Sequence, residues 1–188
     1  MGWHSRGYLP HFDGKEITQA IIFHLADSLP RKIVEKWKEE LSNLPPEESD
    51  VQRRCRLESY LDKGYGSAWL KDPRIARLAE ETILLFDGQR YYLHAWVIMP
   101  NHIHVLITPQ KNWRLSTIIQ TWKSYTAKQA NSILGRTGKF WQEEYFDRFI
   151  RDQRHFIAAL RYIEANPVKA GLCRNKEEWI FGSAARRI

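Results

Sequence analysis

Cysteine is scarce in this 188-residue sequence, which holds only Cys55 and Cys173, far apart along the chain. Two distant cysteines predict neither a disulfide framework nor a cysteine metal site, and they fit a reducing cytoplasm. Long apolar runs are also missing, because no stretch approaches the roughly 20 residues of a membrane-spanning helix. The N-terminus lacks a signal-peptide pattern, and Gly64 and Gly66 match no phosphate-loop spacing. We therefore expect a cytoplasmic protein with no membrane association and no Walker motif.

Positive charge and aromatic side chains, by contrast, are abundant. The net charge is +7 and the isoelectric point is near 9.5, which favours an anionic partner such as nucleic acid. Tryptophan, tyrosine and phenylalanine occur eight times each. We expect most of these rings in the core, but aromatic and basic side chains on one surface suit the stacking of unpaired bases.

The hydrophobic periodicities predict an α+β protein with a single domain over residues 1–188. The order of strands and helices matches a ferredoxin-like split βαβ plan, an antiparallel sheet with helices on one face. In that plan the first strand lies beside the third, and an inserted helical segment at about 45–88 lies in the first crossover. We expect strands at 16–26, 91–98, 102–108 and 145–150, helices at 30–41, 51–61, 73–86, 115–133 and 152–166, an irregular arm at 1–15 and a loop at 44–50.

Two histidines one residue apart, His102 and His104, lie on the third predicted strand. A strand repeats its side-chain direction every two residues, so both imidazoles face one side while Ile103 and Val105 face a core. Two imidazoles on a rigid element make a good start to a metal site. The same pair also fits ordinary surface or hydrogen-bonded histidines. His24 on the neighbouring first strand approaches this place, although its simpler role is to fill the sheet.

A second group of polar residues lies at the end of the last predicted helix. Tyr162 and Asn166 are four residues apart and so share a helix face. Pro167 disfavours helical geometry in the residue before it, so we expect the helix to end at Asn166. Taken alone, Tyr162 also fits a tyrosine packed at a helix interface, and Asn166 also fits a helix-ending device. Tyr125 is the strongest competing tyrosine.

Six segments of the sequence form a further pattern: Met99-Pro-Asn-His-Ile-His104, Tyr162-Ile-Glu-Ala-Asn-Pro-Val168, Arg6-Gly-Tyr-Leu-Pro-His-Phe-Asp13, Phe23-His-Leu-Ala-Asp-Ser-Leu-Pro30, Asp62-Lys-Gly-Tyr-Gly66 and Ala68-Trp-Leu70. Together these segments resemble the REP-associated tyrosine transposases, single-tyrosine transposases of the His-hydrophobic-His (HUH) nuclease superfamily. The resemblance covers roughly residues 6 to 184. It implies metal-dependent cleavage and rejoining of single-stranded DNA or DNA hairpins through a 5′-phosphotyrosine link, by a monomer or a homodimer. It also implies that His102, His104 and Asn166 are metal ligands and that Tyr162 is the nucleophile.

Two imidazole nitrogens and one amide oxygen would fill about three positions of a six-coordinate ion, leaving the others to phosphate oxygens and water. This mixed ligation suits Mn²⁺ well and Mg²⁺ acceptably. Basic and aromatic residues surround the proposed site in the sequence, and we expect some of them to contact phosphates or stacked bases. These candidates are Lys123, Lys128, Arg136, Lys139, Trp141, Arg148, Arg151 and Arg154.

Two other functions stay open on the residues alone. One is a split-βαβ module that binds single-stranded nucleic acid without cleaving it. The other is a metal-dependent hydrolase in which His102 and His104 act with a carboxylate such as Glu143 or Glu144, without a tyrosine intermediate. A covalent protein–DNA adduct separates both from a tyrosine transposase.

Overall fold

A four-stranded antiparallel sheet forms the centre of the molecule in the computed structural model, which describes residues 2–5, 10–13 and 16–186. Its strands are β3 (Gln19–His24), β4 (Tyr91–Ile98), β5 (His102–Pro109) and β6 (Phe146–Phe149), in the spatial order β4-β5-β3-β6. The first of these strands, β3, therefore lies between the third and the fourth, as the split βαβ plan predicts. The register places His24 directly opposite His102.

The predicted irregular arm at 1–15 contains a short hairpin instead. Strands β1 (Gly2–Ser5) and β2 (Pro10–Asp13) pair antiparallel in a separate two-stranded sheet. Short strands without a clear alternation of apolar and polar residues leave little signal in a sequence. Residues 6–9, which belong to the stretch 6–13 used in the family resemblance, lie outside the described residues.

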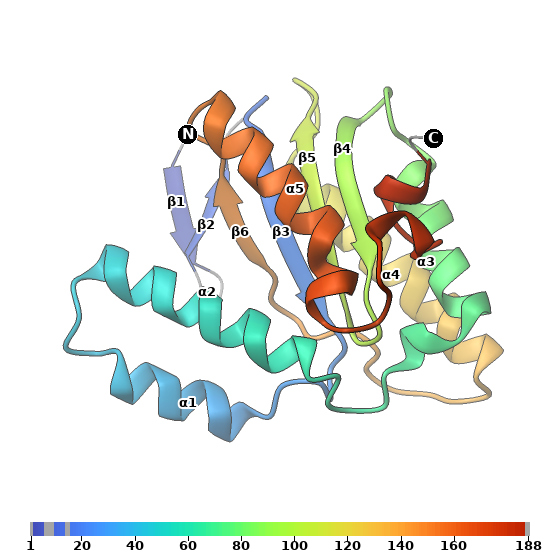
Figure 1. The fold of residues 1–188 in the computed structure, drawn as a ribbon, viewed down its shortest axis with the longest axis horizontal. Coiled ribbons are helices and arrows are strands. Elements are labelled where there is room, and N and C mark those ends of the chain that lie inside the picture. Colours follow the sequence, from blue (N-terminus) through green and yellow to red (C-terminus); the bar gives the residue numbers. More distant parts are fainter. Residues whose placement is uncertain (1, 6–9, 14–15, 187–188) are drawn as a thin grey trace.

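Both faces of the sheet are covered by helices (Figure 1). The crossover helices α3 (Pro73–Leu84) and α4 (Leu115–Ile133) share one face, where they enclose side chains such as Phe23 and Val105. Helix α5 (Gln153–Lys169) packs on the opposite face against Val97 and Leu106. We predicted that all helices lie on one face of the sheet. The two crossover helices do share a face, but α5 lies on the other face, so the prediction is wrong for α5. The reason is that the alternate side chains of the central strands are also apolar and need cover.

Two helices precede α3 in the first crossover, one before the predicted inserted segment at about 45–88 and one within it, and their bounds differ from the prediction. They are α1 (Arg31–Glu40) and α2 (Pro46–Asp62), and they pack with Ile22 of β3 around Leu57 and Leu61. The segment 46–50 was predicted as a loop but forms the first turn of α2. Pro46 is tolerated there because the first helical residues need no N–H group for the helix ladder.

Helix α5 does not end at Asn166 but continues through Pro167 to Lys169. The backbone N–H of Ala170 still donates to the Asn166 carbonyl at 2.9 Å, and that of Leu172 donates to the Pro167 carbonyl at 2.8 Å. Pro167 is buried. Tertiary packing of this turn has overridden the local preference against helix before proline.

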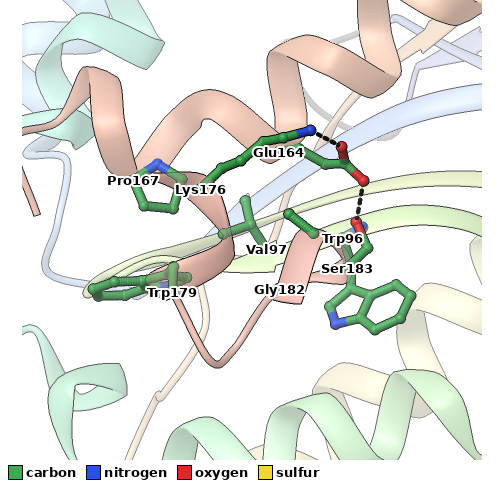
Figure 2. Close-up of a pocket in the computed structure, with 9 residues that line it drawn as sticks. Trp96, Val97, Glu164, Pro167, Lys176, Trp179, Gly182 and Ser183 are labelled. Atoms are coloured by element: carbon green, nitrogen blue, oxygen red, sulfur yellow. Dashed lines mark hydrogen bonds and ion pairs between the residues drawn. The ribbon is translucent and has the colours of Figure 1, made fainter. Parts of the chain in front are cut away.

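The C-terminal segment is held against α5 and along the edge of β4 (Figure 2). Glu164 of α5 accepts hydrogen bonds from Lys176 Nζ at 2.9 Å and from Ser183 Oγ at 3.1 Å. The indole of Trp179 donates to the Ile98 carbonyl at 3.0 Å. The short 3₁₀ helices η2 (Lys176–Glu178) and η3 (Ser183–Arg186) lie within this segment, and η1 (Trp69–Lys71) precedes α3. Within the described residues, none of the helices combines the length and apolar character needed to cross a bilayer.

Candidate active site

His102 and His104 lie side by side on the face of β5 that meets α5. Their side chains are 0% and 2% exposed, and their ring centroids are 4.8 Å apart. Ile103 and Val105 point into the core on the other face, as the two-residue repeat predicts. The two imidazoles are therefore a buried pair and not solvated surface residues.

Four buried polar atoms in this part of the protein have no hydrogen-bond partner. They are Nε2 of His102, Nε2 of His104, Oδ1 of Asn166 and Oδ1 of Asp62. Leaving a polar atom buried and unpaired costs on the order of 1–3 kcal/mol, so several such atoms together need an explanation. All four are lone-pair donors of the kind that bind a divalent cation.

The protonation states of the two histidines suit ligation. Burial lowers the pKa of His104 to about 3 and lowers that of His102 well below its ordinary value. Both imidazoles are therefore neutral near pH 7, which is the form that donates a lone pair to a metal. The Asn101 side-chain oxygen lies 2.7 Å from Nδ1 of His102, which fixes the ring with Nε2 free.

Asn166 is fully buried one turn after Tyr162 on α5. Its side-chain N–H donates to the Tyr162 carbonyl at 3.1 Å, which leaves its oxygen as the unpaired atom. Two neutral imidazoles and one amide oxygen are a donor set that fits Mn²⁺ or Mg²⁺. No three His, Cys, Asp or Glu side chains gather into a metal-holding group in the part of the chain that the structure describes. Neither Glu143 nor Glu144 therefore joins the histidine pair.

Tyr162 lies beside the histidines, with its ring centroid 6.1 Å from that of His104. Its hydroxyl accepts a hydrogen bond from Lys169 Nζ at 3.3 Å and also hydrogen-bonds with the Glu58 carboxylate. Burial raises the pKa of Tyr162 far above its ordinary value, and the negative charge of Glu58 raises it further. The hydroxyl is therefore protonated at rest and has a carboxylate next to it.

Three residues at this site carry no role in the sequence-based prediction: Glu58, Asp62 and Lys169. Asp62 Oδ2 lies 3.4 Å from Lys169 Nζ, and Asp62 Oδ1 lies 3.8 Å from His102 Nε2. Burial raises the pKa values of both Glu58 and Asp62. Glu58 and Asp62 are four residues apart and so share a face of α2, a signal visible in the sequence. What the sequence does not show is that the inserted helix reaches the histidines.

Several predicted DNA-binding residues lie near this site. Arg148 of β6 is part-buried, and burial together with the charges of Arg54 and Arg151 lowers its pKa. Arg54 and Arg151 therefore lie near enough to Arg148 for their charges to act on it. The charge of Arg54 also lowers the pKa of Tyr162, against the larger effects that raise it. Arg154 is exposed in the first turn of α5.

Other predicted DNA-binding residues lie in or near the loop after α4. This loop meets the sheet at the end of β5 where His102 lies. In that loop the Phe140 carbonyl accepts from the Ala26 N–H, and the Gln142 N–H donates to the His24 carbonyl. Lys139 is exposed. Three further candidates are Lys128, which is exposed on α4, Arg136, which lies 5.8 Å from the Trp69 ring centroid, and Arg151, which is exposed after β6.

Lys123 and Trp141 differ from the prediction because both are buried. The Lys123 ammonium donates to the Glu143 carbonyl at 2.5 Å, and burial lowers its pKa to about 8. The Trp141 indole donates to Thr126 Oγ1 at 2.8 Å within the core. Neither side chain is accessible to DNA, because both are buried by packing on the face of the sheet that α4 covers.

The competing residues lie elsewhere or are already engaged. Tyr125 is half exposed on α4, which packs on the opposite face of the sheet from Tyr162. His24 Nδ1 lies 2.9 Å from Ser28 Oγ and 3.0 Å from the Leu25 carbonyl. His24 thus neighbours His102 but serves local hydrogen bonds, as its simpler predicted role requires.

Comparison with known proteins gives this arrangement a family. The profile of the family described as "Transposase IS200 like" matches residues 63–166, more than half of the chain and a span that includes His102, His104, Tyr162 and Asn166. The chain belongs to the IS200-like transposases.

Named relatives agree with this assignment. The chain is 27% identical over 99 residues to a REP-associated tyrosine transposase of Escherichia coli (strain K12), covering 52% of this chain and 57% of the relative. It is 28% identical over 101 residues to a putative REP-associated tyrosine transposase of Haemophilus influenzae, covering 48% of this chain and 57% of that protein. The chain thus spans a little over half the length of these curated relatives.

A solved structure shows the same fold. It is described as a REP-associated tyrosine transposase bound to a REP hairpin, and it superposes with a TM-score of 0.60 at 18% sequence identity. The match covers 96% of this chain and 84% of that one. The match thus extends over nearly the whole of this chain.

Proposed function

We propose that this chain is a metal-dependent DNA strand transferase that cleaves single-stranded DNA beside a hairpin and holds one end on Tyr162. The observation that carries the proposal is that His102, His104 and Asn166 each hold a buried, unpaired ligand atom, while the Tyr162 ring lies 6.1 Å from that of His104. Membership of the transposase family supports the reaction class. The relative described as bound to a REP hairpin supports a hairpin as the partner.

His102, His104 and Asn166 would hold the divalent cation, Mn²⁺ or Mg²⁺. When bound, the ion would polarise the scissile phosphate and offset its charge. The neighbouring arginines 54, 148 and 151 would bind the phosphates on either side of the break. The exposed residues of the loop after α4 would extend this contact along the strand.

The proposed cleavage joins Tyr162 to the DNA. Its Oη attacks the phosphorus, the bond from phosphorus to the 3′ oxygen breaks, and that oxygen leaves with the bonding electrons and takes a proton from water. The hydroxyl proton passes to Glu58. Since the pKa of Tyr162 is raised, the proton leaves during attack and not before it, so a hydrogen-bonded acceptor is required. Attack by another 3′ hydroxyl on the phosphotyrosine reverses the step and rejoins strands without ATP.

The test is a covalent-adduct assay on single-stranded hairpin DNA with randomised single-stranded flanks, labelled at the 3′ end. The labelled segment stays on the tyrosine, so a denaturing gel shows it attached to the protein. We expect the adduct with Mn²⁺, and none after chelation or in His104→Ala, whose DNA affinity should change less than about threefold. An undiminished adduct from the chelated His104→Ala protein would contradict the metal mechanism.

Neither alternative function gains support from the geometry. A hydrolase built on His102 and His104 with Glu143 or Glu144 lacks its third ligand, because neither carboxylate joins the pair. A binding module without catalysis does not account for the unpaired ligand atoms. In the same assay a hydrolase would cleave without an adduct, and a binding module would do neither.

A further inference from the structure

Lys169 brings a cation to the proposed nucleophile, and two helices place it there. Its Nζ lies 3.3 Å from the Tyr162 hydroxyl, 5.1 Å from the Tyr162 ring centroid and 3.4 Å from Asp62 Oδ2. Tyr162 and Lys169 belong to α5, whereas Asp62 is the last residue of α2. The three side chains thus join the inserted helix to the helix of the nucleophile.

The continuation of α5 past Pro167 is what makes this contact. Lys169 follows Tyr162 by seven residues, which is about two helical turns and returns to the same face. A helix that ended at Asn166, as the proline predicts, would release Lys169 from this face. The buried turn at Pro167 therefore has a consequence at the active site.

The surrounding charges give Lys169 a specific task. The Tyr162 oxygen is flanked by the carboxylates of Glu58 and Asp62, and both oppose negative charge on it. Lys169 instead donates a hydrogen bond to that oxygen. About half of the Lys169 side chain is exposed, so part of it stays in contact with solvent.

We propose that Lys169 is a catalytic residue that stabilises the Tyr162 oxygen during strand cleavage, and that Asp62 is the positioning residue that holds its ammonium there. The inference rests on the proposed role of Tyr162 as nucleophile. In the step, the bond from Tyr162 Oη to phosphorus forms and the bond to the 3′ oxygen breaks. Glu58 receives the phenol proton, water protonates the 3′ oxygen, and Lys169 keeps its protons throughout.

Single-turnover adduct formation at saturating hairpin DNA tests the role of Lys169. We expect Lys169→Met to slow the step by about tenfold to a hundredfold, less than the roughly 10²–10³-fold cost of removing an enclosed donor to a developing charge, because Lys169 is half exposed. Its DNA dissociation constant and thermal midpoint should stay close to those of wild type. Lys169→Arg should recover part of the rate, since the cation returns with different geometry. Lys63→Met, which removes an exposed lysine beside Asp62, is the matched control and should react at the wild-type rate.

A double-mutant cycle tests the role of Asp62. If Asp62 acts by holding Lys169, Asp62→Asn slows the step less than Lys169→Met does, and the double variant is no slower than Lys169→Met. If Asp62 acts independently, through His102 for example, the two losses multiply and its positioning role is overturned. Mn²⁺ affinity, measured by calorimetry, distinguishes the two cases, because a role through His102 lowers it in Asp62→Asn and a role through Lys169 does not.

The outcomes separate this inference from the function beneath it. A wild-type adduct that depends on Tyr162 but forms equally fast in Lys169→Met overturns the role of Lys169 alone. An adduct that persists in Tyr162→Phe, or no adduct from wild type, overturns both. Slow reaction in Lys169→Met with rescue by arginine supports both.

Discussion

His102 and His104 differ from ordinary histidines because their free ring nitrogens are buried without partners. In the sequence alone, the same pair also fitted ordinary surface or hydrogen-bonded histidines. A His-x-His pattern on a strand predicts that both side chains face the same way, but it does not predict whether they are buried. Burial also decides their charge, since it lowers their pKa values and keeps both rings neutral. His24 shares this environment, with a pKa lowered to about 4 by burial.

These buried histidines predict lower stability in acid for the protein without metal. Below pH 6.5, the pKa of an unfolded histidine, the unfolded chain binds protons at these side chains and the folded protein does not. The free energy of unfolding therefore falls as the pH falls from 6.5 toward the pKa values of the folded protein. For His104, with a folded pKa of about 3, the loss between pH 7 and pH 5 is on the order of 2 kcal/mol. Thermal midpoints measured in chelator at the two pH values check this.

A variant isolates the histidine part of that trend. The raised pKa values of Glu58 and Asp62 act in the opposite sense, because the folded protein binds protons there more readily than the unfolded chain. His104→Gln keeps these carboxylates and removes one titrating ring, so its midpoint should fall less between pH 7 and pH 5 than that of wild type. An equal or steeper fall in His104→Gln would argue against a neutral buried His104.

At the scale of elements, helix α5 carries the proposed nucleophile and also anchors the C-terminal segment. Tyr162, Asn166 and Lys169 lie toward the site, while Glu164 holds Lys176 and Ser183 (Figure 2). Glu164 is almost fully buried, and Lys176 is part-exposed. A buried carboxylate that loses its cation keeps its desolvation cost, so this pair should matter for stability.

Lys176→Met should therefore destabilise the protein by about 1–2 kcal/mol, less than the 3–5 kcal/mol typical of a fully buried pair because Lys176 is part-exposed. Chemical denaturation measures the change. The neighbouring substitution Glu177→Gln alters an exposed carboxylate and should stay within about 0.5 kcal/mol of wild type. Equal stability of Lys176→Met and Glu177→Gln would show that the Glu164 contact does not fasten the segment.

The strongly periodic elements could be predicted from the sequence, because their apolar spacing directly reflects burial. Strand β4 and helix α4 have the predicted bounds, 91–98 and 115–133, and β5 begins at His102 as expected. The predicted end of α5 at Asn166 was wrong, because the packing of Pro167 outweighs the local preference against helix before proline. The carboxylates of α2 were missed because their approach to the histidines depends on tertiary packing of an inserted helix, which no local pattern encodes.

At the scale of the whole molecule, the excess of positive charge has a local focus. The net charge is +7, and the charges of Arg54 and Arg151 both act on Arg148. Two of the three, Arg148 and Arg151, belong to the predicted DNA-binding set. Helix α2 contributes the third, so the inserted segment serves the basic surface as well as the site.

Binding to hairpin DNA should weaken as salt rises, because each phosphate contact releases condensed counterions. Arg148→Ala and Arg151→Ala should each reduce the slope of log affinity against log salt by about one. Lys111→Ala is the control, since this exposed lysine follows Pro109 at the far end of β5 from His102. Hairpins with single-stranded flanks should bind more tightly than blunt duplex. Equal affinity for both at one salt concentration, or equal slopes for all variants, would place the DNA surface elsewhere.

The central claim is that Tyr162 forms the covalent link to DNA, and Tyr162→Phe tests it most directly. The change removes one oxygen and keeps the ring, so folding and DNA binding should change little while the adduct and strand cleavage both disappear. Asn166→Ala should instead raise the Mn²⁺ concentration needed, because it removes a ligand and keeps the nucleophile, and Tyr125→Phe should leave the adduct intact. In the 3′-labelled assay we predict an adduct from wild type and Tyr125→Phe and none from Tyr162→Phe. A covalent adduct from Tyr162→Phe, or equal cleavage by wild type and Tyr162→Phe with no adduct from either, would contradict the account.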